Sequence, residues 1–278
     1  LSLRRQRQMC IRDSLQTENN SLQLRGSEME HSVQRVYGAK ARMALMVPST
    51  NTVAETEFWE MAPDGITIHT SRMPFFAERF EKPFDEMESH LPRVIDEVNS
   101  AEPDVIAYAC TASSAKGNPI VYETELSKKT GKPTVTAAAA LVEAMRVFKA
   151  KNIIMITPYP QETNDKECGF FKENGIEVIQ DESIIVDESQ QKFKNMNRVP
   201  SDLIVERAVN LGSHENVEAV VLSCCDMPTL AAIPKIESAL GKPVTSSTQS
   251  LFWRTMKAAK LPDQIKGRGC LLYTSPSP

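Results

Sequence analysis

The chain has 278 residues, and its formal net charge of −4 argues against a general nucleic-acid binder, which carries a basic patch. No apolar run approaches the roughly 18–20 residues that cross a bilayer, and no apolar segment typical of a signal peptide follows the arginine-rich start. With 41% hydrophobic and 24% charged residues, the composition is that of a globular protein. We therefore expect a cytoplasmic protein with reduced cysteines and with no nucleic-acid or membrane partner.

Both ends of the chain look foreign to the protein. Residues 270–278 resemble a translated sequencing adapter, and Met9–Ser14 resemble the reverse complement of the same adapter. Residues 15–38 are polar and have no clear period. We therefore interpret residues 1–38 as an adapter-like and poorly ordered tail and 269–278 as an adapter-like tail, and we expect the natural ends to lie elsewhere.

Between these tails, short apolar runs alternate with helical patterns. In the first half, strands are predicted at Ala41–Val47, Ile66–Thr70, Val105–Ala109 and Gly131–Val135, and helices after Thr52 and at Phe84–Ser100, Pro119–Lys129 and Ala137–Lys149. In the second half, strands are predicted at Asn152–Thr157, Ile176–Gln180, Val217–Ser223 and Gly241–Val244, and helices at Glu162–Asn174, Ser201–Leu211, Leu230–Leu240 and Gln249–Lys260. Residues 187–199 are polar and irregular.

The two halves repeat one plan. Three landmarks recur at nearly the same spacing, namely Pro48 with Pro158, Cys110 with Cys224, and Gly131-Lys-Pro with Gly241-Lys-Pro. Such self-similarity indicates an internal duplication, and strands that alternate with helices predict parallel sheets.

The predicted fold is therefore α/β, with two similar lobes, each a parallel sheet flanked by helices, and an active site in the cleft between them. We assign residues 39–145 together with about 245–268 to the first lobe and residues 146–244 to the second.

Each lobe has a predicted strand that ends in a cysteine, Cys110 in the first and Cys224 in the second. Open α/β sheets bind ligands just past the carboxyl ends of their strands, where free backbone N–H groups can hold an anion. A thiol can transfer protons near carbon, and a thiolate is a strong nucleophile toward activated alkenes. Two thiols on opposite faces of a small substrate suit either racemisation or cis–trans isomerisation.

The loops beside these cysteines contain neutral hydrogen-bonding groups and few cations. We therefore expect a small carboxylate substrate, held by neutral donors that gain strength in a dry cleft. The candidate substrate-binding residues are Ser49, Thr50, Asn51, Thr111, Tyr159 and Cys225.

Over about Ala41–Lys260 the chain resembles the aspartate/glutamate racemase superfamily and, within it, the maleate cis–trans isomerases. The residues that carry the resemblance are Val47–Thr52 with Glu55-Thr-Glu57, Ala109-Cys-Thr111, Thr157-Pro-Tyr159 and Leu222–Leu230. The resemblance assigns substrate binding to Asn51 and Tyr159, nucleophilic attack to Cys110, and acid–base work to Cys224.

The resemblance also implies a mechanism. The Cys110 thiolate would add to maleate C2 to give a covalent succinyl intermediate, and rotation followed by elimination would give fumarate. No cofactor would be needed, and a homodimer is expected. Two alternatives stay open: an amino-acid racemase of the Asp/Glu type that uses the same two cysteines, and a small-acid binding protein without catalysis.

The chain departs from the family pattern at two places. Ala112 stands where the family usually has Ser, and the family's further substrate-binding Asn has no evident equivalent in Asp187–Asn197. Arylmalonate decarboxylases share the fold but typically have Gly in place of the first cysteine, so Cys110 argues against that activity.

Overall fold

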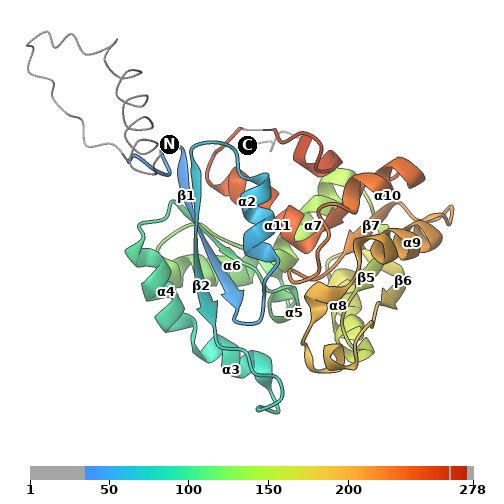
Figure 1. Ribbon diagram of the computed structural model, residues 1–278, viewed down its shortest axis with the longest axis horizontal. Helices are drawn as coiled ribbons and strands as arrows, with labels where there is room; N and C mark the ends of the chain where they lie inside the picture. Colours follow the sequence, from blue (N-terminus) through green and yellow to red (C-terminus); the bar gives the residue numbers. More distant parts are fainter. Residues whose placement is uncertain (1–34, 263, 274–278) are drawn as a thin grey trace, which may run out of the picture. The chain divides into compact units, whose positions relative to one another are not determined.

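The computed structural model describes residues 35–262 and 264–273, and from Val36 onward the chain forms one compact unit. Of the predicted tails at 1–38 and 269–278, residues 1–34 and 274–278 lie outside the described residues. Two four-stranded parallel sheets make up the framework (Figure 1). This confirms the predicted two-lobed α/β fold.

The two sheets have the same strand order. The first runs β2 (Ile66–Met73), β1 (Ala41–Pro48), β3 (Val105–Tyr108), β4 (Thr134–Thr136). The second runs β6 (Glu177–Ser183), β5 (Asn152–Thr157), β7 (Ala219–Leu222), β8 (Val244–Ser246). The inner strands β3 and β7 are wholly buried, which explains their continuous apolar sequences. The shared order confirms the internal duplication.

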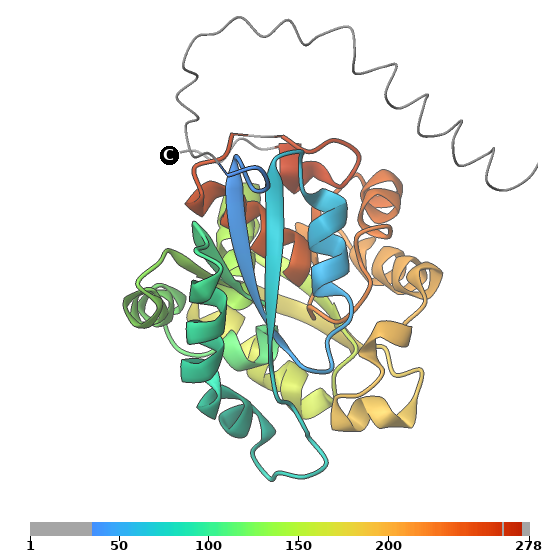
Figure 2. The same cartoon turned by 60° about the vertical axis from the view of Figure 1, so that its left-hand side comes forward.

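Helices cover both faces of each sheet. In the first half they are α2 (Ala54–Met61), α3 (Pro83–Ser89), α4 (Leu91–Ser100), α5 (Thr111–Ser114), α6 (Pro119–Thr130) and α7 (Ala137–Phe148). In the second half they are α8 (Gln161–Glu173), η1 (Glu188–Lys192), η2 (Met196–Arg198), α9 (Ser201–Gly212), α10 (Ile233–Leu240), α11 (Ser247–Ala258) and η3 (Cys270–Tyr273). Figure 2 shows α2 and α4 on opposite sides of β1 and β2.

Most predicted elements are confirmed, with differences at their ends. The largest concern the strands predicted to begin at Gly131 and Gly241, because both glycines instead end helices in the left-handed conformation and the strands begin at Thr134 and Val244. The exception is the predicted helix Phe84–Ser100, which is two helices joined at His90. Pro92 explains the break, because a proline lacks the backbone N–H of a helix interior and is tolerated only in the first turn.

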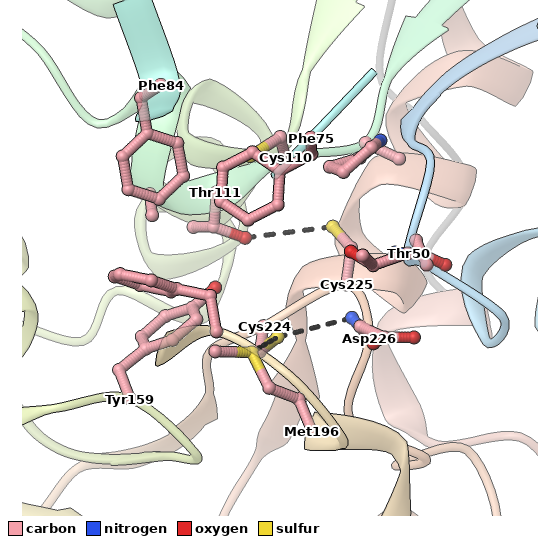
Figure 3. Close-up of a pocket in the computed structure, with 15 residues that line it drawn as sticks. Thr50, Phe75, Phe84, Cys110, Thr111, Tyr159, Met196, Cys224, Cys225 and Asp226 are labelled. Carbon is pink, nitrogen blue, oxygen red and sulfur yellow. Dashed lines mark hydrogen bonds between the residues drawn. The ribbon is translucent and has the colours of Figure 1, made fainter. Parts of the chain in front are cut away.

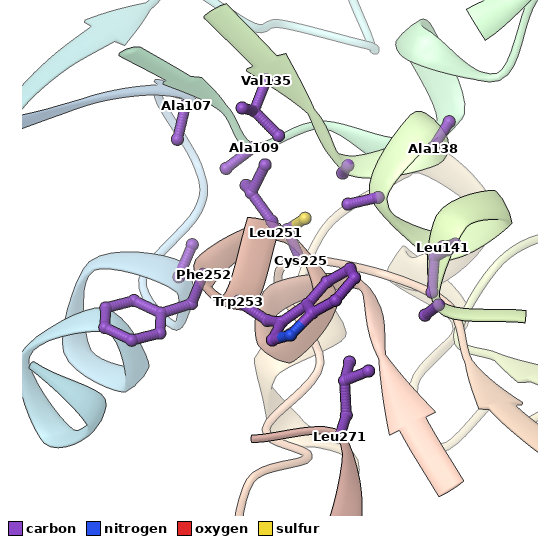
Figure 4. Packing of buried hydrophobic residues seen from close by; sticks show 14 of the residues in the cluster. Ala107, Ala109, Val135, Ala138, Leu141, Cys225, Leu251, Phe252, Trp253 and Leu271 are labelled. Carbon is purple, nitrogen blue, oxygen red and sulfur yellow. The ribbon is translucent and has the colours of Figure 1, made fainter. Parts of the chain in front are cut away.

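Helices α7 and α11 form a layer shared by the two sheets. Helix α7 contacts β4 but also β7 and β8, and α11 contacts β8 but also β3 and β4. Figure 4 shows Leu251, Phe252 and Trp253 of α11 packed among residues of this layer and of the first sheet. The two helices therefore join the sheets of the two lobes. The proposed lobe boundaries stay a prediction.

The short helix η3 lies in the segment that we interpreted as an adapter-like tail. Its Leu271 and Leu272 are buried in the same core cluster as α7 and α11 (Figure 4). These residues therefore contribute to the packed structure, and their adapter origin stays a prediction. In the part of the chain that is described, no helix has both the length and the apolar character needed to cross a membrane.

Candidate active site

A pocket lies where the carboxyl ends of the two sheets meet. It is lined by loops that follow β1, β2 and β3 in the first lobe and β5 and β7 in the second (Figure 3). Of the sequence-predicted site residues, the pocket brings together Thr50, Asn51, Cys110, Thr111, Tyr159, Cys224 and Cys225. Ser49 is not among the lining residues.

Ser49 and Asn51 both lie in the loop after β1, but only Asn51 lines the pocket. The Ser49 hydroxyl accepts a hydrogen bond from the Phe75 N–H at 3.0 Å, so it joins this loop to the loop after β2. The Asn51 Oδ1 accepts from the N–H groups of Val53 and Ala54 at 3.1 and 3.0 Å and caps α2. The cap uses the oxygen and leaves the Nδ2 amide of Asn51 as the group that can donate to a ligand.

Cys110 follows β3, directly before α5, and is 7% exposed. Burial raises the pKa of its thiol to about 11, while hydrogen bonds from the side chain and backbone of Ser113 act in the opposite direction. The next residue, Thr111, donates to the Ser247 hydroxyl at 2.8 Å, and its Oγ1 lies 3.7 Å from the Cys225 sulfur (Figure 3). Because its pKa is raised, the Cys110 thiol is protonated at neutral pH. The hydrogen bonds from Ser113 are in place to stabilise its thiolate.

Cys224 follows β7 and lines the same pocket. Its backbone N–H donates to the Ser247 hydroxyl at 3.0 Å, and its sulfur accepts from the Asp226 N–H at 3.2 Å (Figure 3). Burial raises the pKa of this thiol well above its usual value, against an opposing hydrogen bond from Tyr159. Ser247 thus holds the loops of both cysteines, although its place at the start of a helix gave no sign of this role.

Two carboxyl side chains connect the lobes: Glu57, which is buried, and Asp226, which is half-buried and lines the pocket. Glu57, on α2, accepts from the N–H groups of Thr229 and Leu230 at 2.7 and 2.8 Å. Burial raises its pKa to about 7. Asp226 accepts from the Thr52 N–H at 2.8 Å, and burial raises its pKa to about 6. These bonds fix the second cysteine loop against the loop after β1.

One wall of the pocket is aromatic, and sequence reasoning missed it. Phe84 lies 5.2 Å from Phe75 and 5.1 Å from Phe193 between ring centroids, and Tyr159 lies 6.2 Å from Phe193. Met196 completes this wall. Phe75 lies beyond Thr70, where the predicted strand ended, although β2 in fact continues to Met73. Phe193 and Met196 lie in the irregular segment, where no periodic pattern exists.

The irregular segment contributes no asparagine to the pocket. The Asn195 amide donates to the Ser189 hydroxyl at 2.8 Å, and the Asn197 amide donates to the Thr52 hydroxyl at 2.6 Å. The segment presents Phe193 and Met196 instead. Of the residues in this segment that line the described pocket, neither therefore carries the amide that the resemblance leads one to expect.

One pocket holds two buried thiols, which come from equivalent strand ends of the duplicated lobes, together with neutral hydrogen-bond donors. These features define a two-lobed, two-cysteine α/β enzyme. Such a site can form a covalent bond to carbon on one side and transfer a proton on the other.

Comparison with known proteins places the chain within this class. The family model described as arylmalonate decarboxylase matches residues 84–272. A maleate isomerase of Pseudomonas putida is 32% identical over 257 residues, covering 83% of this chain and 96% of the relative. A maleate isomerase of Geobacillus stearothermophilus is 30% identical with the same coverage. The chain therefore belongs to the arylmalonate decarboxylase family.

The fold agrees with these sequence matches. A crystal structure of a Pseudomonas putida maleate isomerase with maleate superposes with a TM-score of 0.75 at 26% identity, covering 84% of this chain and 97% of the other. An arylmalonate decarboxylase superposes with a TM-score of 0.71 at 20% identity, which shows the shared fold.

Proposed function

We propose that this protein is a cofactor-independent isomerase that converts maleate, or a close cis-butenedioate, to its trans isomer through a covalent adduct on Cys110. The observation that carries the proposal is the pair of buried thiols at equivalent strand ends in one pocket. The maleate isomerases matched over nearly their full length support the same chemistry.

The first half of the reaction forms the adduct. The reacting species is the Cys110 thiolate, with its proton released to solvent. A new bond joins the sulfur to C2 as the C2=C3 π bond breaks, and the electron pair passes to C3. The Cys224 thiol delivers its proton to C3, which leaves a succinyl group on Cys110 and a thiolate on Cys224. The raised pKa of Cys224 keeps it as the acid that this step needs.

The second half reverses these bonds after rotation. C2–C3 is now a single bond, so the two carboxylates can move to opposite sides. The Cys224 thiolate then takes the C3 proton, the double bond re-forms, and the Cys110 sulfur leaves as a thiolate. Nothing is oxidised or reduced. Asn51 Nδ2, Thr50 and Thr111 are the neutral groups that would hold a carboxylate beside Cys110.

Proton NMR of maleate with the full-length, reduced protein tests the proposal. We expect fumarate to accumulate with the wild type and not with Cys110→Ala or Cys224→Ala. Circular dichroism of both variants shows whether the fold is retained. A folded and reduced wild type that produces no fumarate at saturating maleate would refute the maleate assignment.

The same two thiols favour racemisation of an α-substituted acid as a second candidate function. One thiolate would remove the Cα proton and the opposite thiol would return one. This hypothesis predicts that a single enantiomer of aspartate or glutamate gains solvent deuterium at Cα. A non-catalytic binding protein would instead keep its affinity for a small acid in both cysteine variants and show no turnover.

We also propose a cytoplasmic location and a homodimer. The chemistry requires reduced thiols at Cys110 and Cys224, which a reducing compartment maintains. Light scattering of the purified protein tests the dimer, and fractionation of expressing cells tests the location.

A further inference from the structure

A second cavity adjoins the active-site pocket, and we call it the cationic recess after its charged side chains. Thr50, Phe75 and Phe193 line both the pocket and the recess. One side of the recess comes from the loop between β2 and α3, and the other comes from the end of η1 and the residues after it. The charged residues that line it are Glu78, Arg79, Lys192 and Lys194.

Three cations face a single carboxylate in the cationic recess. Lys194 Nζ donates to the Glu78 carboxylate at 2.6 Å, and this ion pair joins the two lobes. The Arg79 guanidinium lies over the Phe76 ring, 4.7 Å from its centroid. Lys192 is exposed and forms no ion pair with any residue in the described part of the chain. The hydrogen bond from Lys194 lowers the pKa of the Glu78 carboxyl, and the charges of Lys192 and Arg79 act in the same direction.

Another cavity adjoins the pocket and carries mainly carboxyl groups. Phe84, Ala112 and Phe193 line both this cavity and the pocket. Lys166 is the one cation among its described lining residues, and it pairs with Glu162 at 2.8 Å. The remaining charged lining residues are Glu81 and Glu167. An anion near the pocket is therefore attracted toward the cationic recess and repelled from this acidic cavity.

We propose that the cationic recess binds carboxylate anions and concentrates the dicarboxylate substrate beside the pocket. The inference rests on the proposed function only for the identity of the anion, because any small carboxylate is attracted in the same way. Among the described residues that line the pocket there is no Lys, Arg or His, so the recess supplies positive charge beside a site whose own donors are neutral. Cations that line a cleft raise the local concentration of an anion, most strongly at low ionic strength.

Alkylation of the pocket thiol Cys110 measures this attraction without any isomerisation. Iodoacetate and iodoacetamide both alkylate a thiolate with loss of iodide, but only iodoacetate is an anion. The ratio of their rates at the Cys110 peptide, followed by mass spectrometry at pH 8 and low ionic strength, does not depend on the thiolate fraction. We expect Lys192→Glu to lower the ratio of iodoacetate to iodoacetamide by about threefold to tenfold, and Lys192→Gln by about the square root of that factor.

Lys128→Glu is the matched control, because it makes the same change of charge at an exposed position. Lys128 lies in the last turn of α6 and lines neither the pocket nor the recess. Its ratio of alkylation rates should equal that of the wild type. At about 1 M salt, where the screening length is about 3 Å, the effect of Lys192→Glu should disappear.

Maleate carries two charges at pH 8, so its kcat/KM in Lys192→Glu should fall by about the square of the factor found for iodoacetate. A ratio of alkylation rates that is unchanged in Lys192→Glu would overturn the inference and leave the proposed isomerase intact. An equal fall in Lys128→Glu would also overturn it, because net charge alone would then explain the result. If the wild type forms no fumarate but the ratio falls in Lys192→Glu alone, the recess stands and the isomerase proposal fails.

Discussion

Replacing Glu57 with glutamine should change how the stability of the protein depends on pH. Burial raises the pKa of Glu57 from 4.5 to about 7. Between these values the folded protein binds a proton at this carboxyl that the unfolded chain has lost, so the free energy of unfolding falls as pH rises. At ~1.4 kcal/mol for each tenfold change in the proton equilibrium, the full effect is ~3 kcal/mol.

The glutamine side chain in Glu57→Gln would be an uncharged acceptor for the Thr229 and Leu230 N–H groups, and it has no proton to lose. The variant therefore lacks this decline and should gain about 2.5 kcal/mol relative to the wild type between pH 5 and pH 8, since part of the full effect lies below pH 5. The buried carboxyl of Glu167, whose pKa burial also raises to about 7, is present in both proteins and cancels in the comparison.

Urea unfolding of both proteins at pH 5, 6, 7 and 8 measures this difference. Glu125→Gln, an exposed position on α6, is the control and should follow the wild type at every pH. An equal pH dependence of Glu57→Gln and the wild type would refute the assignment of Glu57 as a buried carboxyl with a raised pKa that links the lobes.

Three further outcomes are expected. The kcat/KM for maleate should rise about tenfold per pH unit from pH 7 to pH 9 without a plateau, because the pKa of Cys110 is raised to about 11 and its thiolate fraction grows with pH; a plateau below pH 8 in a rate profile would contradict this. Ser113→Ala removes a hydrogen bond that lowers the Cys110 pKa, so kcat/KM should fall by one constant factor from pH 7 to pH 9 and the ultraviolet titration of the Cys110 thiolate should move to higher pH, whereas an unchanged thiolate titration would indicate a merely structural effect. Leu271→Ala should lower the free energy of unfolding by about 2–5 kcal/mol in urea, as for other buried leucines, and a change below about 0.5 kcal/mol would show that η3 is not part of the core.

The fold and the cysteine pair could be predicted from the sequence because both leave local signals. Buried parallel strands are continuous apolar runs, and Cys110 and Cys224 follow two of them at matching positions. Asn51 could also be predicted as a site residue. Its amide oxygen can cap a helix while its amide nitrogen donates to a ligand.

The rest of the site depends on contacts that no local pattern encodes. In the sequence Glu57 is an ordinary acidic residue in the first turn of a helix, and only the tertiary structure brings it to Thr229 and Leu230. Ser247 marks the start of a helix and yet holds both cysteine loops. Phe193 lies in a turn whose left-handed backbone favours other residues, so its place in the pocket wall follows from packing alone.

The most direct test of the central claim is intact-protein mass spectrometry combined with proton NMR on full-length Cys224→Ser and Cys110→Ser incubated with maleate. If Cys110 is the nucleophile and Cys224 the acid–base partner, Cys224→Ser should gain the mass of one maleate on the peptide that contains Cys110, with the C3 proton taken from water. It should form little fumarate, because no Cys224 thiolate remains to remove that proton. Cys110→Ser should gain no mass and form no fumarate. Undiminished fumarate production by Cys110→Ser would contradict the account.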